Sequence, residues 1–364
     1  MEIQKKLYSI AIIGYKSVSF PPWDPESIYT GLPGSEEAIV YASEALTKLG
    51  YKVDVYMDPP EDSIWKLPES NPRWFSVDVW SNIDYRIKYD LVVMWRDILA
   101  DIGRLRGKKV FYWPHDVPKL TFRNYKPTFD GICWLSNDQK NRYATLFASN
   151  TTKYTICGNG HIPSQFEFEP RLIKKKHPYK IGYFSNYSKG LNVLLYIWPF
   201  VRRTYPRATL DIYYGRETFG GLSLPEMDQL LFRIKSLESS GVTEKGKVGH
   251  LVLAEAMKDI SIWAYPCIDI ETFCITAIKA QASGCIPVTT RLGALNETIS
   301  PLAPSIPMIA NQDDVDTYKK LLCGALSRVE KEETENERMK YIDYAKQFTW
   351  DNCVKKWVDL YHSV

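Results

Sequence analysis

The sequence predicts two α/β domains, each built on a parallel β-sheet. The chain has 364 residues, which exceeds the usual size of a single domain. Short apolar runs alternate with helical stretches along both halves, a pattern typical of βαβ units. A charged, proline-containing stretch at 167–178 separates the halves and has the composition of a linker. We therefore predict domains over residues 1–172 and 173–345.

Four strands and one helix are expected in the first half. The strands are short and apolar, at 8–13, 52–56, 89–94 and 109–113. The helix is expected over 35–49, with Ser35 as its N-cap and Gly50 just after its last residue. Strands and helices that alternate in this way normally form a doubly wound sheet.

The second half repeats the same alternation. Apolar strands are expected at 179–184, 209–214, 260–265 and 286–290, with helical stretches at 190–203, 222–237 and 273–283. Residues 348–361 place apolar side chains near helical spacing, which predicts a final helix. That helix can pack on its own domain or on the first one.

The composition excludes several classes of protein. Lys and Arg number 46 against 43 Asp and Glu, and a net charge of +3 is too small to indicate a nucleic-acid or anionic membrane partner. The apolar stretch at 9–14 is too short for a signal peptide or a spanning helix, so a cytoplasmic protein is expected. The seven cysteines lack CxxC spacing and are expected to be reduced core residues rather than zinc ligands.

Three features of the first half could take part in ligand binding. The loop 31–37, which contains Gly34, lies between the first strand and the first helix, where α/β folds gather ligands. It can equally be an ordinary capped loop. His115 beside Asp116 follows a strand and suits hydroxyl recognition or proton handling, although a structural loop histidine has the same appearance. Asn159 precedes a glycine and by itself marks only a turn.

The second half carries sharper signals. Lys189 falls between a strand and a helix, at a position open to a phosphate, although surface lysines are also common there. Glu271 lies on a loop just before a helix. The backbone N–H groups at the start of that helix would form a diphosphate site, and they belong to Phe273, Cys274 and Ile275.

These segments occur in a recognisable order. The second half resembles the retaining glycosyltransferases of family 4. The stretches that carry this resemblance are 184–191, 208–215, 246–250, 271–284 and 293–297. The first half matches more loosely, through 31–37, 113–116, 135–136 and 158–160. The resemblance implies a GT-B architecture, in which two Rossmann-like domains face each other across a cleft. It also implies that the second domain holds the nucleotide, that the first holds most of the acceptor, and that the C-terminal helix, within 346–364, packs back on the first domain.

The resemblance also implies roles for individual residues. Lys189 is similar to the family's basic residue on the donor diphosphate, Glu271 to the acid that accepts from donor sugar hydroxyls, and His115 to the histidine near the sugar. The backbone of Lys247 and Val248 is similar to the segment that reads the base. Gly34 and Asn159 lie in matched segments and are further candidates for donor binding. The donor would be a UDP- or GDP-sugar, with no metal and no other cofactor.

Two positions depart from the family pattern. Lys279 stands where the family has a second acidic residue, usually placed on the donor ribose, and an ammonium cannot accept hydrogen bonds from hydroxyls. Its side chain would point at the ribose or a phosphate, or lie in solvent. An arginine expected about five residues before Lys189 is also absent, and Arg216 is the candidate for that second charge.

The expected function is metal-independent hexosyl transfer with retention of configuration. In this architecture the leaving diphosphate is stabilised electrostatically and helps to take the acceptor proton, so no enzymic nucleophile is required. The acceptor hydroxyl would belong to a glycan, a lipid or another small molecule. Two alternatives stay open: transfer to a modified DNA base, and a non-catalytic protein that binds sugar nucleotides.

Overall fold

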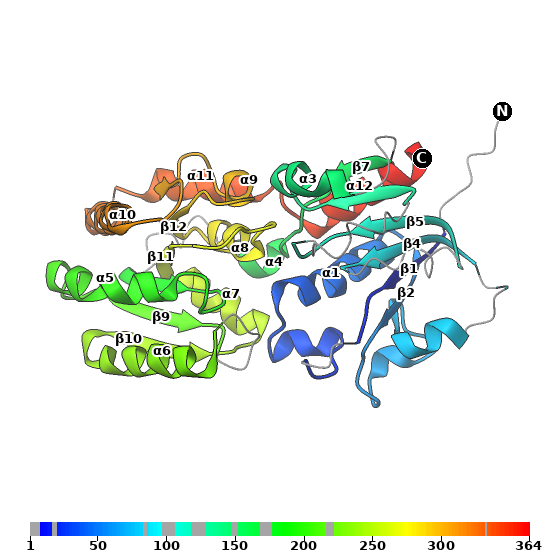
Figure 1. Cartoon of the computed structure of the whole chain (residues 1–364), viewed down its shortest axis with the longest axis horizontal. Helices are drawn as coiled ribbons and strands as arrows, with labels where there is room; N and C mark the ends of the chain where they lie inside the picture. The colour runs from blue at the N-terminus through cyan, green and yellow to red at the C-terminus, as the bar shows by residue number, and fades with distance from the viewer. Residues whose placement is uncertain are drawn as a thin grey trace. The chain divides into compact units, whose positions relative to one another are not determined.

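The computed structural model describes residues 8–16, 20–82, 86, 88–96, 106–117, 129–146, 152–167, 177–215, 222–331 and 333–364. The chain divides into two compact units (Figure 1). Unit 1 comprises residues 1–28, 34–160 and 349–364, and unit 2 comprises 29–33 and 161–348. The domain limit expected at 172 lies outside the described residues. Each unit contains one parallel sheet, so the predicted pair of α/β domains is confirmed.

Unit 1 contains a seven-stranded parallel sheet in the order β3-β2-β1-β4-β5-β6-β7. Its strands are β1 (Ser9–Ile13), β2 (Lys52–Met57), β3 (Arg73–Ser76), β4 (Tyr89–Trp95), β5 (Gly107–Trp113), β6 (Gly131–Trp134) and β7 (Lys153–Ile156). Its described α-helices are α1 (Gly34–Lys48), α3 (Asn137–Tyr143) and α12 (Trp350–Ser363). Short 3-10 turns occur at Pro25–Tyr29, Ile64–Lys66, Val77–Asn82 and Ala144–Leu146.

Unit 2 contains a six-stranded parallel sheet in the order β10-β9-β8-β11-β12-β13. Its strands are β8 (His177–Tyr183), β9 (Thr209–Tyr213), β10 (Val242–Gly246), β11 (Ile260–Tyr265), β12 (Ile286–Thr290) and β13 (Ser305–Ile306). Its helices are α4 (Pro163–Phe166), α5 (Leu191–Thr204), α6 (Leu224–Ser236), α7 (His250–Asp259), α8 (Ile275–Ala282), α9 (Leu295–Thr298), α10 (Gln312–Glu330) and α11 (Glu335–Ala345), with a 3-10 turn at Glu238–Ser240.

Hydrophobic burial accounts for the central elements. All seven residues of β4 are buried, as expected for a strand covered on both faces. The final helix α12 belongs to unit 1, where it packs against α1, β6 and β7. Its buried residues recur at helical spacing and include Cys353, Trp357 and Leu360.

Among the described residues, no helix has both the length and the apolar composition that crossing a membrane requires.

Each sheet contains one point at which the strand order reverses. In unit 1 the chain builds β2 and β3 on one side of β1 and then places β4 on the other side. In unit 2 the same reversal separates β8 from β11. Open α/β sheets bind ligands at such reversals, outside the carboxyl ends of the strands. The side chains that follow β1, β4, β8 and β11 therefore define where a site is expected.

Candidate functional site

Lys189 and Glu271 meet at the reversal point of unit 2. Lys189 follows β8 and Glu271 follows β11, and these two strands are paired. The Lys189 Nζ donates to Glu271 Oε1 at 2.9 Å. Burial opposes the charge of the Lys189 ammonium, but the Glu271 carboxylate outweighs this effect and raises the pKa of Lys189. The ammonium therefore stays charged over the whole physiological pH range.

A chain of hydrogen bonds fixes the carboxylate of Glu271. The hydroxyl of Tyr265, at the end of β11, donates to Glu271 Oε1 at 2.5 Å, and Ser185 Oγ donates to the Tyr265 hydroxyl at 3.2 Å. Burial, followed by the nearby Glu271 charge, raises the pKa of Tyr265 well above its ordinary value. Tyr265 therefore stays protonated and acts as a permanent donor. The same oxygen of Glu271 thus receives two hydrogen bonds, one of them charged.

Two glycines allow the loops around this pair to approach closely. Gly190, with a φ of 103°, lies so near the backbone of Pro266 that an added Cβ would stand 2.0 Å from the Pro266 oxygen. Gly293, with a φ of 63°, forms an isolated β-bridge with Glu271. A Cβ at position 293 would lie 2.5 Å from the backbone oxygen of Glu271. A side chain at either position would push the loop that carries Glu271 away.

The N-terminus of α8 lies next along the chain after Glu271. The helix begins at Ile275, and Cys274 precedes it with a φ of 69°, in the left-handed region. The ring of Phe273 packs edge-on against Phe348, with centroids 5.9 Å apart. In the described part of the chain, the amides of Phe273, Cys274 and Ile275 donate to no other residue. Free amides at a helix N-terminus favour an anion, because the helix dipole adds to their partial charge.

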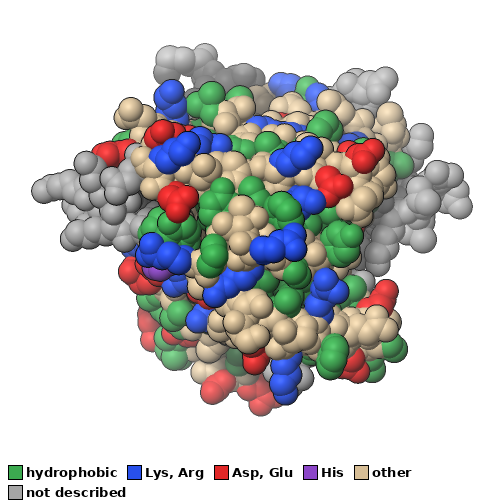
Figure 2. Space-filling model, turned by 90° about the vertical axis from the view of Figure 1, so that its left-hand side faces the viewer, with side chains coloured by type: hydrophobic (Ala, Val, Ile, Leu, Met, Phe, Trp, Pro, Cys, Tyr) green, Lys and Arg blue, Asp and Glu red, His purple; other side chains and the backbone are tan. Residues whose placement is uncertain are grey.

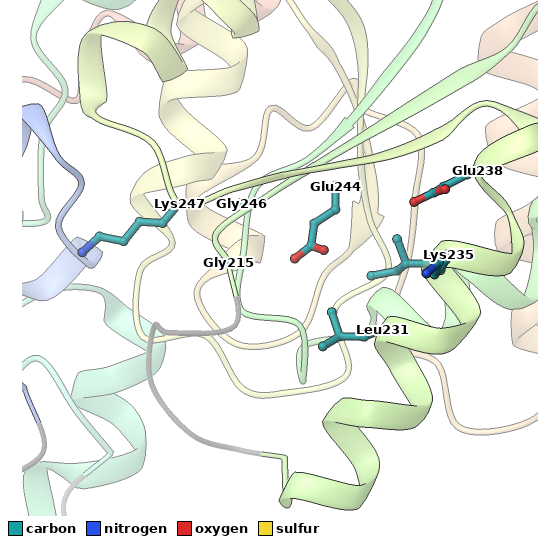
Figure 3. Close-up of a pocket in the computed structure, with 8 residues that line it drawn as sticks. Gly215, Leu231, Lys235, Glu238, Glu244, Gly246 and Lys247 are labelled. Atoms are coloured by element: carbon teal, nitrogen blue, oxygen red, sulfur yellow. The ribbon is translucent and has the colours of Figure 1, made fainter.

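A cavity of about 550 Å³ opens between β10 and α6. Figure 3 shows the Glu244 carboxylate directed into this space and the Lys247 side chain extending away from it. The hydroxyl of Tyr187 donates to Glu244 at 2.8 Å. Val248 lies next to the segment Tyr29–Pro33, which belongs to unit 2. The cavity is lined by Gly215, Leu231, Ile234, Lys235, Glu238, Glu244, Gly246 and Lys247.

Lys279 does not occupy a solvent-exposed position. Its side chain is buried, with the residue only 3% exposed, and its Nζ lies 4.9 Å above the ring of Phe166. The alternative in which its side chain lies in solvent is therefore excluded, because α4 covers this part of α8. His161 is also buried nearby, where burial lowers its pKa to about 4 and the charge of Lys279 acts in the same direction. The sequence also allowed contact of Lys279 with a donor ribose or phosphate, but its burial over Phe166 leads us to expect little contribution to donor binding.

Unit 1 brings a second group of polar side chains together at its own reversal point. Arg96, which follows β4, donates from Nη1 to Glu36 Oε1 at 2.6 Å, and its Nε lies 3.0 Å from Asp116 Oδ2. His115 is buried edge-on against Trp113, with ring centroids 4.3 Å apart. Burial, with a smaller effect from Arg96, lowers the pKa of His115 well below its ordinary value, so its imidazole is neutral at pH 7.

The remaining predicted site residues are Gly34, Asn159 and Arg216. Gly34 is the exposed first residue of α1, in unit 1, whereas the neighbouring segment Tyr29–Pro33 belongs to unit 2. Asn159 is buried after β7, and its Oδ1 has no partner among the described residues. Arg216 lies outside the described residues.

Sequence reasoning missed Tyr265, Glu36 and Arg96 as members of these groups. Tyr265 is the last residue of a buried apolar strand, where a tyrosine is ordinarily a core residue. Glu36 lies in the first turn of α1, where an acidic residue ordinarily stabilises the helix dipole, and Arg96 follows β4 without a surrounding motif. The signal that could have identified them is their position at the end of a central strand or at the start of the first helix.

No protein-family description matches the sequence, and no curated protein is similar to it in sequence. Solved structures are similar in fold. Sucrose-phosphate synthase from Thermosynechococcus elongatus is 16% identical, with a TM-score of 0.71 over 98% of both chains. Anabaena HepE, in complex with UDP-glucose, is 13% identical, with a TM-score of 0.71 over 98% of this chain and 100% of HepE. A glycosyltransferase from Rickettsia africae is 14% identical, with a TM-score of 0.70 over 99% of this chain and 98% of its own. The chain therefore has the GT-B fold of two Rossmann-like α/β domains.

Proposed function

We propose that the chain is a glycosyltransferase that moves a sugar from a nucleotide diphosphate donor to an acceptor hydroxyl, with retention of configuration. The observation that carries this proposal is the Lys189–Glu271 pair beside the free amides of α8, at the strand reversal of a GT-B unit. The pair supplies a permanent cation for a diphosphate and a carboxylate for sugar hydroxyls. The similarity to family 4 in the order of segments supports retention.

The chemistry would depend on charge placement rather than on a protein nucleophile. The diphosphate leaves with an increased negative charge, which Lys189 and the amides of Phe273, Cys274 and Ile275 are placed to stabilise. Glu271 would accept hydrogen bonds from the donor sugar and hold it in one orientation. Its two protein donors already fix the direction of its carboxylate, so little reorganisation is needed when the donor binds.

The donor that we propose is a UDP- or GDP-sugar. HepE, which has the same fold, was crystallised with UDP and with UDP-glucose. The cavity beside Lys247 falls within the usual size range of small-molecule sites, and the proposed base-reading backbone of Lys247 and Val248 lies at its edge. Glu244 is an acceptor inside this cavity that can receive a hydrogen bond from a base N–H.

Donor binding is tested directly by the thermal stability of the whole chain. Nucleoside diphosphates and their sugars would be screened for an increase in melting temperature, because a ligand at 100 times its Kd adds about 2.7 kcal/mol. Lys189→Met should remove most of the increase. Lys258→Met is the matched control, since Lys258 lies on α7 and pairs with the exposed Glu255. Stabilisation by no nucleotide, or equal stabilisation of both variants, would overturn the proposal.

A non-catalytic protein that binds sugar nucleotides is the second candidate. The buried Lys279, in place of an acidic residue, favours it, because one recognition group for the ribose is missing. The purified protein separates the candidates: an enzyme of this kind slowly hydrolyses its donor even without an acceptor, and a binding protein does not.

A DNA acceptor receives no support from the one face of the molecule that Figure 2 shows. On the face of the molecule shown in Figure 2, Lys and Arg side chains are spread among hydrophobic and neutral ones rather than gathered into one stripe. A DNA-binding surface normally concentrates its basic residues. Salt-dependent binding of duplex DNA would restore this candidate.

A further inference from the structure

We propose that the group of side chains at the strand reversal of unit 1 binds an uncharged carbohydrate through its hydroxyl groups. This inference rests on the proposed function, for which it names the class of acceptor. The residues that carry it are Glu36, Arg96 and Asp116, together with the stacked rings of Tyr15 and Trp95. They follow β1, β4 and β5 or begin α1, and these strands are neighbours in the sheet (Figure 1).

The charges of this group disfavour an anionic ligand. One guanidinium, Arg96, lies between two carboxylates, those of Glu36 and Asp116. Its positive charge is therefore already compensated. A phosphate or carboxylate placed here would approach two acidic side chains, and the neutral His115 would add no attraction.

Glu36 Oε2 and the indole N–H of Trp95 are buried polar atoms of this group that lack partners among the described residues. Glu36 is only 3% exposed, and Oε2 is the oxygen of its carboxylate that Arg96 does not contact. Because Oε1 is bonded to Arg96, covalent geometry places Oε2 beside it. The indole N–H of Trp95, which is 2% exposed, likewise has no partner there. One group accepts and the other donates, and buried groups of this kind are costly unless a ligand or water pairs with them.

A sugar hydroxyl matches this mixture because it both donates and accepts. It can donate to Glu36 Oε2 or to the carboxylate of Asp116, whose side chain is 57% exposed. It can also accept from the indole N–H of Trp95. A phosphate only accepts. The hydroxyl pattern therefore agrees with the charges in favouring a neutral polyol.

The aromatic residues supply an apolar surface for the sugar ring. Tyr15 stacks on Trp95 with ring centroids 5.9 Å apart and an angle of 20° between the planes, and Tyr15 is 36% exposed. The Arg96 guanidinium lies 4.5 Å from the Trp95 ring centre. Trp95 is thus held in place, and Tyr15 is the ring that solvent and ligand can reach. Exposed aromatic rings beside polar groups are typical of small-molecule sites.

Backbone geometry indicates that the position of Arg96 is imposed by its surroundings. Arg96 has a φ of 60°, in the left-handed region that a long side chain rarely adopts. Its amide donates to the Trp113 oxygen at 3.2 Å, and its own carbonyl accepts from the Tyr112 hydroxyl at 3.1 Å. Such strained residues are concentrated at functional sites.

Saturation-transfer NMR on the full chain tests the proposal without using a donor. The probes are the neutral sugars maltose, lactose and cellobiose, with glucose 6-phosphate, galacturonic acid and a DNA duplex for comparison. We expect saturation of at least one neutral sugar and not of the anionic probes. Tyr15→Ala should weaken the neutral sugar by about tenfold, whereas Tyr15→Phe keeps the ring and should bind normally. Glu36→Gln should also weaken it.

UDP is added to the same samples as an independent check. If UDP binds equally to wild type and to the Tyr15 variants, the loss of sugar binding is independent of donor binding, and normal sugar binding by Tyr15→Phe shows that unit 1 tolerates a substitution at this position. Saturation of no neutral sugar, preference for the anionic probes or DNA, or undiminished binding by Tyr15→Ala would overturn the carbohydrate site. Failure of wild type to bind any nucleotide would instead contradict the proposed function.

Discussion

The ammonium of Lys189 lies 2.9 Å from the carboxylate of Glu271, although 82 positions separate the two residues in the chain. The pairing of β8 with β11 brings them together, because each residue belongs to the loop that follows one of these strands. Each group is therefore held by the other, so a change at either residue is felt by both.

Glu271→Gln should lower kcat by at least about tenfold and leave nucleoside diphosphate affinity nearly unchanged. The amide can still accept from Lys189 and Tyr265, but it loses the charge that strengthens hydrogen bonds from sugar hydroxyls. Steady-state kinetics and calorimetry measure the two effects. Glu255→Gln on α7 is the control, since Glu255 is exposed and pairs only with Lys258 among the described residues. Unchanged kcat would remove Glu271 from the site.

Tyr265→Phe should lower kcat with little change in nucleotide affinity. The substitution keeps the ring and removes the hydroxyl that donates to Glu271 Oε1, so the carboxylate is held by Lys189 alone. The loss of this buried hydrogen bond should also cost about 1–3 kcal/mol of unfolding free energy. Urea unfolding and kinetics on the same protein separate the two effects. A loss of stability with normal kcat would show that Tyr265 is only structural.

Lys279→Met should change nucleoside diphosphate affinity by less than about twofold. Methionine has a similar length and can keep the contact with Phe166, towards which the Lys279 ammonium is directed. A residue that bound the ribose or a phosphate would instead cost roughly 1.5–3 kcal/mol of binding free energy when removed. Calorimetry with UDP and GDP distinguishes the two results, with Lys189→Met as the positive control.

The unfolding free energy should fall as the pH is lowered from about 6.5 to about 4. His161 is buried with its Nδ1 2.6 Å from the Phe348 oxygen, and burial lowers its pKa to about 4. The unfolded chain takes up a proton near pH 6.5 and the folded chain does not, so protonation favours unfolding throughout this interval. The contribution of His161 is about 3 kcal/mol. His161→Asn should show a shallower fall in urea titrations, whereas an unchanged slope would contradict this assignment.

Activity should survive chelation with EDTA. In the described part of the chain no three His, Cys, Asp or Glu side chains are grouped as metal ligands. Lys189 and the α8 amides are placed to carry the charge of the diphosphate. Donor hydrolysis, measured before and after dialysis against EDTA, checks this. Loss of turnover that manganese or magnesium restores would show that a metal takes part.

The sequence predicted the central strand β4 but not β10 and β13, which lie at the two edges of the sheet in unit 2. β4 was predicted because its apolar residues follow one another, and the structure shows that the strand is buried along its whole length. β10, with the sequence VTEKG, was missed because it lies at the sheet edge and exposes three of its five residues. β13 has only two residues, too few for any periodicity.

The sequence predicted individual residues of the candidate site but not the contacts between residues that are far apart in the chain. Lys189 and Glu271 were found from their places in loops before helices. Their mutual contact depends on strand order, which local patterns do not contain. The burial of Lys279 beneath Phe166 was not expected for the same reason, since α4 and α8 are more than 100 residues apart.

The path of the chain between units constrains the order in which the protein can fold during synthesis. Unit 1 includes α12, whose Trp350 and Trp357 are almost fully buried, so its core is incomplete until the ribosome has made residues 349–364. Unit 2 has all its residues by position 348. The domain made second can therefore complete its core before the one made first, which is the reverse of the usual N-terminal-first order. Until then, nascent unit 1 leaves exposed the surfaces of α1, β6 and β7 that α12 later covers.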